Sequence, residues 1–202
     1  PYELFAIPSA RAVFRADDGA LGAELWVSDG TAGGTMLVDD IAPGTASSSP
    51  SQFAVSSGKL FFRANDGTSG YELWTWTTGG VSQVVDIEPG AGSSSPSTLY
   101  AVGTTVVFSA CTTADGCEPW RSDGTALGTY MVRDLCPGSC GSLSWYRGPL
   151  AAVGDRLFFA ANDAVHGLEL WVTDGTSSGT RMLTHFTPED SRGACSTTSW
   201  GG

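Results

Sequence analysis

Residues 24–31, with the sequence Glu-Leu-Trp-Val-Ser-Asp-Gly-Thr, recur along the chain, and this recurrence decides the fold. Residues 169–176 repeat the stretch almost unchanged, and residues 118–125 keep the glutamate, the tryptophan and the Asp-Gly-Thr ending. A fourth copy, residues 72–74, keeps only Glu-Leu-Trp. The tryptophans of the four copies lie at positions 26, 74, 120 and 171, at intervals of 48, 46 and 51 residues. A period near 50 residues is typical of propellers and solenoids.

Each repeat unit contains four short apolar runs, which we name strands a, b, c and d in chain order. No stretch shows the 3.6-residue period of an amphipathic helix. Pairs of adjacent large residues, such as Phe61-Phe62 and Leu73-Trp74, put apolar side chains on both faces of the predicted strands. A four-stranded sheet that like neighbours cover on both faces is a propeller blade. The sequence therefore predicts an all-β fold, a four-bladed β-propeller with four antiparallel strands per blade.

We expect residues 1–202 to form a single propeller domain, with blades at approximately residues 1–48, 49–94, 95–146 and 147–202. Strand a is expected to be innermost, because its small residues suit close packing around an axis. These small residues are Ala6, Ala54, Ala101 and Ala152. The end of unit four continues in register into strand a of unit one, which predicts a closed ring with adjacent termini. The alternative is a longer array from which these four units are an excerpt.

Glycine and aspartate mark the predicted turns. The connection between strands c and d is Asp-Gly-Thr in three units, where Gly30, Gly124 and Gly175 can adopt positive φ. Strand d is followed by Pro-Gly in three units, which predicts the end of the strand.

Composition limits the partners that this chain can have. The formal net charge of −11 argues against nucleic acid and anionic membrane surfaces, because both require a basic surface. No apolar run reaches 18 residues, so we expect no membrane span.

The five cysteines predict disulfides and a secreted protein, because no pair has the spacing of a zinc site. Cys111 and Cys117 flank the loop between strands b and c of unit three, where antiparallel neighbours bring Cα atoms within disulfide range. Cys136 and Cys140 flank a tight Pro-Gly-Ser turn. We therefore predict the pairs Cys111–Cys117 and Cys136–Cys140. Cys195 is left unpaired in this chain and available to a covalent or non-covalent partner.

Together, these residues resemble the bacterial ELWxxDGT repeat family. The resemblance rests on the repeats above and on Asn65-Asp66-Gly67, Val85-Asp86-Ile87 and Pro89-Gly90. Unit four departs from the pattern, since His185 stands where the other units have aspartate. The family consists mostly of secreted or surface-exposed proteins without an established catalytic activity, so the resemblance implies a binding or scaffolding role.

The loop between strands b and c is acidic in every unit. It contains Asp18, Asp66, Asp115 and Asp163. Carboxylates and carbonyls of this kind can bind Ca²⁺, which takes six to eight oxygen ligands. The alternative is that each aspartate caps backbone N–H groups of its own turn. Calcium is thus an optional cofactor of the predicted fold.

Two function classes remain. The first is a non-enzymatic, extracellular binding or scaffolding module that presents loops to protein or glycan, with Trp145 and Trp200 in the connectors as the recognition surface. The second is a polysaccharide hydrolase or lyase that uses acidic residues near the propeller axis. We favour the first, because the acids recur with the repeat unit, which indicates a structural role. The only two histidines, His166 and His185, both lie in unit four.

Overall fold

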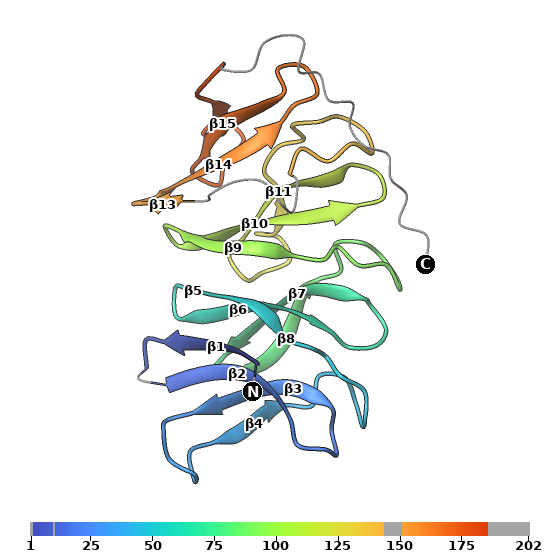
Figure 1. Ribbon diagram of the computed structural model, residues 1–202, viewed down its shortest axis with the longest axis vertical. Helices are drawn as coiled ribbons and strands as arrows, with labels where there is room; N and C mark the ends of the chain where they lie inside the picture. Colours follow the sequence, from blue (N-terminus) through green and yellow to red (C-terminus); the bar gives the residue numbers. More distant parts are fainter. Residues whose placement is uncertain (1, 10, 144–150, 186–202) are drawn as a thin grey trace.

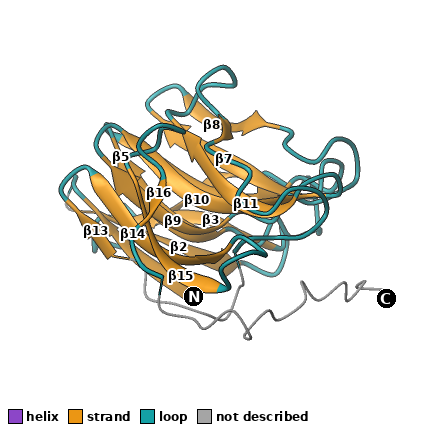
Figure 2. Ribbon diagram, turned by 90° about the horizontal axis from the view of Figure 1, so that it is seen from above, coloured by secondary structure: helices purple, strands orange, loops and turns teal. Residues whose placement is uncertain are grey.

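The computed structural model describes residues 2–9, 11–143 and 151–185, which form sixteen β-strands and no helix. The strands make four antiparallel sheets of four, and within each sheet the spatial order follows the order in the chain (Figure 1). The all-β fold and the four antiparallel four-stranded units predicted from the sequence are confirmed. The sheets stack face to face along the long axis of the molecule, as Figures 1 and 2 show from two directions.

The strand bounds follow the repeat units closely. The first sheet contains β1 (Tyr2–Ile7), β2 (Arg11–Asp17), β3 (Ala23–Ser28) and β4 (Met36–Asp39). The second contains β5 (Ser51–Ser56), β6 (Lys59–Asn65), β7 (Tyr71–Thr77) and β8 (Gly80–Val85). The third contains β9 (Ser97–Val102), β10 (Thr105–Thr112), β11 (Gly116–Ser122) and β12 (Tyr130–Met131). The fourth contains β13 (Ala151–Val153), β14 (Arg156–Asn162), β15 (Leu168–Thr173) and β16 (Arg181–Met182).

The Glu-Leu-Trp motif gives each sheet two different apolar faces. Successive residues of a strand point to opposite sides, so leucine and tryptophan of the motif lie on opposite faces, which we call the Leu face and the Trp face. Leu25 of the first sheet belongs to the same buried cluster as Phe62 and Trp74 of the second sheet. Leu73 of the second sheet clusters in the same way with Phe108 of the third. The core is therefore a series of Leu faces packed on the Trp faces that follow.

The same arrangement continues between the third and fourth sheets. Val107, on the Leu face of the third sheet, clusters with Leu157, which lies on the Trp face of the fourth. The first strands of successive sheets, β1, β5, β9 and β13, also contact one another. Strand a is thus the strand through which neighbouring sheets meet, in agreement with its predicted inner position.

The predicted closed ring is not what the described residues form. The first and fourth sheets lie at opposite ends of the stack (Figure 1), and no extensive contact joins them in the described part of the chain. The alanine column expected around an axis is also interrupted, because Val55, rather than Ala54, occupies the position equivalent to Ala6. Ala6 is itself exposed. The described residues form an open arc, and at each end of it one face is not covered by another described sheet.

Candidate functional site

The motif glutamate is buried in every unit, and in the first three it holds the connector that leads to the next sheet, whereas Glu169 of the fourth accepts a hydrogen bond from the Thr184 hydroxyl. Glu72 accepts hydrogen bonds from the Ser94 N–H (2.7 Å), the Ser94 hydroxyl (2.6 Å) and the Ile87 N–H (3.1 Å). Ser94 in turn accepts, through its carbonyl, the N–H of Cys111 on the third sheet at 2.8 Å. Glu24 and Glu118 bind Ser48 and Ser142 in the same way. This arrangement, which we call the glutamate–serine clamp, ties successive sheets together.

The clamp explains one strongly shifted pKa. Burial raises the pKa of Glu118 from its ordinary value of 4.5 to about 7, even though Ser142 and Leu135 donate hydrogen bonds to it. Burial also raises the pKa of Glu24 and Glu72. The carboxylates that recur with the unit are therefore structural groups enclosed by protein.

The shifted pKa predicts that stability depends on pH. Folded Glu118 binds a proton more tightly than the unfolded chain, so its contribution is complete below pH 4.5 and is lost as pH rises through about 7. We expect urea denaturation to show the free energy of unfolding falling by about 2 kcal/mol between pH 5 and pH 8. Glu118→Gln should flatten this slope. An equal slope in the variant would contradict the assignment.

The Asp-Gly-Thr motif is a self-contained turn. Asp123 accepts hydrogen bonds from the N–H (2.9 Å) and the hydroxyl (2.7 Å) of Thr125, whose hydroxyl oxygen accepts the N–H of Gly128 at 3.0 Å. Gly124 has a φ of +85°, and a Cβ on Gly128 would lie 2.1 Å from the Asp123 carboxylate. The same bonds recur at Asp29 and Asp174. The motif therefore forms the turn, and one carboxylate oxygen of its aspartate accepts both hydrogen bonds.

Asp18, Asp66 and Asp163 of the b–c loops cap backbone N–H groups of their own turns, whereas Asp115 accepts the Thr112 hydroxyl. Asp18 accepts the N–H groups of Ala20 and Leu21, and these hydrogen bonds lower its pKa. Asp66 likewise accepts N–H groups of the two residues that follow Gly67. Each aspartate lies in a different sheet. Within residues 2–9, 11–143 and 151–185, no group of three or more His, Cys, Asp or Glu side chains is arranged to hold a metal.

Calcium binding at Asp18, Asp66, Asp115 or Asp163 stays a prediction. If a loop binds Ca²⁺, removing the ion with a chelator should lower the melting temperature, because a ligand that binds only the folded state stabilises it. Differential scanning calorimetry with and without chelator measures the effect, and Mg²⁺ addition is the control. An unchanged melting temperature, with no calcium by elemental analysis, would leave the aspartates as turn caps.

The glycine before Glu-Leu-Trp makes the close approach between loop and connector. Gly70 has a φ of +68°, and a Cβ there would lie 1.8 Å from the carbonyl oxygen of Gly92. Gly67, in the same loop, has a φ of +86° but open space around it. We expect Gly70→Ala to cost about 3 kcal/mol through strain and overlap, and Gly67→Ala about 1 kcal/mol through strain alone. Equal losses in thermal denaturation would refute the proposed contact with the connector.

The structure places both predicted cysteine pairs at disulfide distance. Cys111 and Cys117 face each other in the register of β10 and β11, with sulfur atoms 2.01 Å apart. Cys136 and Cys140 are bonded across the turn that follows the third sheet. Cys195 lies outside the described residues, as do Trp145 and Trp200. The two disulfides stiffen one edge of the arc, where b–c loops and connectors meet.

Unit four places its two histidines together at this same edge. The Nδ1 atom of His166 lies 2.6 Å from the Asp163 carboxylate, and the rings of His166 and His185 meet edge to face at 4.9 Å between centroids. Burial raises the pKa of Asp163, but hydrogen bonds from the backbone and ring of His166 outweigh it and lower the pKa overall. His185 is exposed. The aspartate thus orients a ring at an accessible surface.

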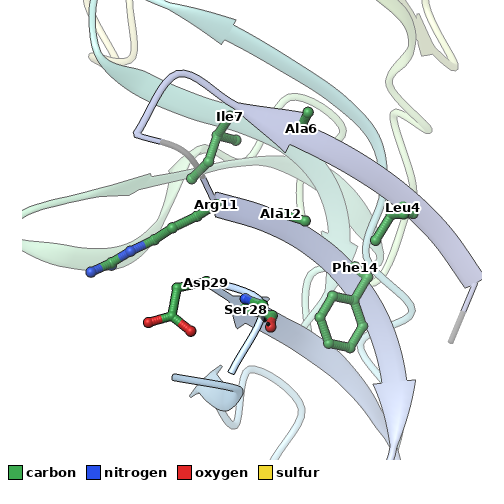
Figure 3. Close-up of a pocket in the computed structure, with 9 residues that line it drawn as sticks. Leu4, Ala6, Ile7, Arg11, Ala12, Phe14, Ser28 and Asp29 are labelled. Carbon is green, nitrogen blue, oxygen red and sulfur yellow. Dashed lines mark hydrogen bonds between the residues drawn. The ribbon is translucent and has the colours of Figure 1, made fainter. Parts of the chain in front are cut away.

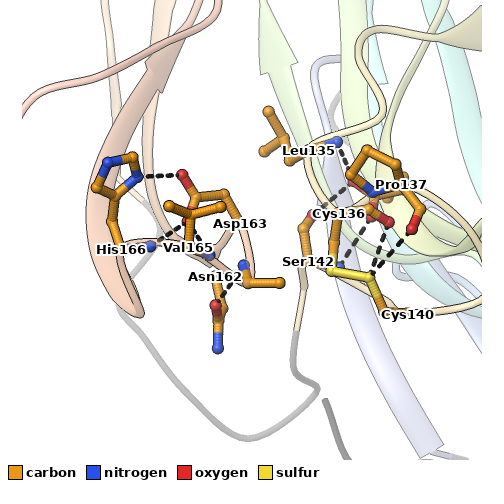
Figure 4. The surroundings of a disulfide bond; sticks show 11 residues. Leu135, Cys136, Pro137, Cys140, Ser142, Asn162, Asp163, Val165 and His166 are labelled. Atoms are coloured by element: carbon orange, nitrogen blue, oxygen red, sulfur yellow. Dashed lines mark hydrogen bonds and ion pairs between the residues drawn. A yellow bond between two sulfur atoms is a disulfide. The ribbon is translucent and has the colours of Figure 1, made fainter. Parts of the chain in front are cut away.

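The loop that contains Asp163 and His166 lies beside the disulfide-bonded connector. Figure 4 shows this loop in the surroundings of the Cys136–Cys140 disulfide. The Asn162 N–H donates to the Ser142 carbonyl at 3.0 Å, which fixes the loop of the fourth sheet against this connector. We call Asp163, His166, His185 and the connector 136–143 the histidine edge. It is the candidate functional site, because its side chains are specific to units three and four.

Sequence reasoning did not place the two histidines in contact. His166 precedes β15 in the chain and His185 follows β16, and histidine at these positions is not part of the repeat pattern. The available signal was that both histidines occur in one unit, with His185 replacing the repeated aspartate.

A groove of about 570 Å³ lies on the uncovered Trp face of the first sheet (Figure 3). Leu4, Ala6, Ala12 and Phe14 line it, and Arg11 and Asp29 stand at one side. Its lining is mainly apolar, and it belongs to the end of the arc rather than to the histidine edge.

Comparison with known proteins supports the fold. No protein-family description and no curated protein matches the sequence. The structure is similar to puromycin hydrolase, with a TM-score of 0.61 and 15% identity over 92% of this chain and 29% of that one. It is also similar to TolB from Acinetobacter baumannii, with a TM-score of 0.52 and 13% identity over 85% of this chain and 39% of that one. The chain thus spans well under half of these proteins.

A third similar structure is acylaminoacyl peptidase from Pyrococcus horikoshii, with a TM-score of 0.50 and 12% identity over 86% of this chain and 25% of that one. At these identities the similarity concerns the fold alone. Because the neighbours are propeller folds, the four stacked sheets are of the β-propeller type. In the described segments, no helix has the length and apolarity needed to cross a bilayer.

Proposed function

We propose that this chain is a non-enzymatic, extracellular binding module, whose four sheets serve as propeller blades that present loops to a protein or glycan. The observation that carries the proposal is that the repeated polar side chains and the unit-specific ones lie in different surroundings. The repeated glutamates and turn aspartates are engaged in internal hydrogen bonds, whereas the accessible, unit-specific groups gather at the histidine edge. Such an edge, held by two disulfides, suits recognition by rigid loops.

Two further observations support an extracellular role. The paired cysteines are compatible with an oxidising compartment, and the acidic composition disfavours nucleic acid. The resemblance to ELWxxDGT repeat proteins, to which we assign the chain, agrees with a secreted or cell-surface binding protein. Trp145 and Trp200 lie outside the described residues, and we keep them as candidate recognition residues of the proposed module.

The alternative is a polysaccharide hydrolase or lyase that uses acidic residues near the axis. Such an enzyme needs two accessible carboxylates on either side of the scissile bond. Glu24, Glu72 and Glu118 do not meet this requirement, because each is fully buried.

A defined glycan array and a panel of purified extracellular proteins test the binding proposal, and a polysaccharide activity screen tests the alternative. We expect a specific ligand whose affinity falls at least tenfold in His166→Ala and His185→Ala. Val165→Ala, at an exposed neighbour in the same loop, is the matched control. Turnover of a polysaccharide, or equal binding by all variants, would contradict the proposal.

A further inference from the structure

The two ends of the arc carry the residues that its internal interfaces bury. The motif leucine is 0% exposed in the first and second sheets, as Leu25 and Leu73, but Leu170 of the fourth sheet is 38% exposed. On the other face, Phe62 and Phe108 are 0% and 2% exposed, whereas the equivalent Phe14 of the first sheet is only partly buried. Each end is therefore half of an interface that the chain builds three times internally.

No other sheet among the described residues covers the Leu face of the fourth sheet, where Leu170 is exposed although Val172 is only 2% exposed. Leu170 lies opposite Ala160 in the register of β14 and β15, beside Phe158 and Val172. Leu183, equivalent to Val38 in the buried cluster of the first sheet, is 42% exposed. The face is apolar and has the composition of the Leu faces inside the arc.

In the described part of the chain, no other sheet covers the Trp face of the first sheet. Leu4 is 75% exposed there, although its equivalent in the second sheet, Phe53, packs against Phe5 of the neighbouring sheet at 6.1 Å between ring centroids. The groove along Leu4, Ala12 and Phe14 (Figure 3) lies where a preceding sheet would rest. A large apolar surface of this kind is typical of an interaction site.

Polar groups at the two ends match as well. Between the second and third sheets, Lys59 donates to the carbonyl of Asp123, in the Asp-Gly-Thr turn, at 2.7 Å. Arg156 holds the position of Lys59 in the fourth sheet, and Asp29 holds that of Asp123 in the first. A fourth interface of the same kind would thus bring a cation onto the Asp29 turn.

We propose that the Leu face of the fourth sheet docks on the Trp face of the first sheet in a second copy of this chain, head to tail. The argument for a second copy is continuity with the internal interfaces, because this pairing repeats their packing of a Leu face on a Trp face and the cation–turn contact between the second and third sheets. Since the two surfaces differ, the interface is heterologous. Each further copy of the chain binds through its Trp face to the free Leu face of the copy before it, until a ring closes. The inference concerns assembly and stands apart from the proposed ligand.

Native mass spectrometry and light scattering of the intact chain at about 50 μM test the proposal. The wild-type chain is expected to be a dimer or a larger oligomer. Leu170→Asp and Phe14→Asp should each be monomeric, because each removes one surface. An equimolar mixture of the two variants should form a heterodimer, since one intact Leu face and one intact Trp face remain. This complementation is specific to a heterologous interface.

Leu127→Asp is the matched control, because Leu127 is 97% exposed and lies away from both end faces. It should assemble like the wild-type chain. Leu183→Asp provides a second Leu-face variant if Leu170→Asp fails to fold by circular dichroism. A monomeric wild-type chain would overturn the proposal and favour further sheets of a longer polypeptide as the occupants of both ends. Unchanged assembly in folded Leu170→Asp or Leu183→Asp would also overturn it.

Discussion

Replacing Trp171 with alanine is expected to lower the free energy of unfolding by about 3–5 kcal/mol. Trp171 is only 6% exposed and packs with Leu135, Phe159 and Ala161 where the third sheet meets the fourth. Alanine would remove most of this apolar surface and leave a cavity that neighbouring strands cannot fill. Urea denaturation followed by circular dichroism measures the loss.

Two further variants make the Trp171 result interpretable. Trp171→Phe keeps much of the buried surface and should cost less than the alanine variant. Leu127→Ala removes a side chain that is 97% exposed and should change stability by less than about 0.5 kcal/mol. A loss below about 1 kcal/mol for Trp171→Ala would show that the tryptophan is not part of the core.

Glu72→Ala is expected to lower the free energy of unfolding by about 3–4 kcal/mol, since it leaves buried donors without an acceptor. The N–H groups of Ile87 and Ser94 and the Ser94 hydroxyl all bond to this carboxylate. Each unsatisfied buried donor costs about 1–3 kcal/mol, and water entering the site offsets part of the sum. Because Ser94 also bonds to the third sheet, hydrogen exchange at Cys111 should accelerate.

Glu88 offers a matched control for this experiment. It also bonds to the next sheet, accepting the N–H (3.0 Å) and the hydroxyl (2.9 Å) of Thr113, but at an exposed position where water can replace it. Glu88→Ala should therefore cost less than about 1 kcal/mol. Equal losses in the free energy of unfolding for Glu72→Ala and Glu88→Ala would show that burial of the clamp does not add to its stabilising effect.

The strands and turns could be predicted from the sequence because their causes are local. The Asp-Gly-Thr turn is built from hydrogen bonds between residues two and three positions apart. The motif therefore predicts the turn in every unit that keeps it. Cys111–Cys117 and Cys136–Cys140 close loops of six and four residues, where strand pairing or a tight turn leaves few alternatives. Repetition of Glu-Leu-Trp showed that both faces of each sheet are apolar.

The candidate site could be predicted only in part. The acidic loops were located correctly, but the partner of the motif glutamate was not, because Ser94 lies 22 residues beyond Glu72 in a connector without regular structure. The contact between His166 and His185 likewise depends on the pairing of β15 with β16, which brings distant residues to one edge.

By itself, the sequence determined the strands, the turns, the pairing of four cysteines and the stacking of sheets that are apolar on both faces. Only the tertiary structure decided that the arc is open, that the glutamates clamp the connectors and that the histidines meet. The physical reason is that strand and turn formation depend on short-range bonds and on the alternation of side chains. The rotation between sheets depends on how large side chains such as Phe5 and Phe53 pack against each other across an interface, and small rotations accumulate along the stack.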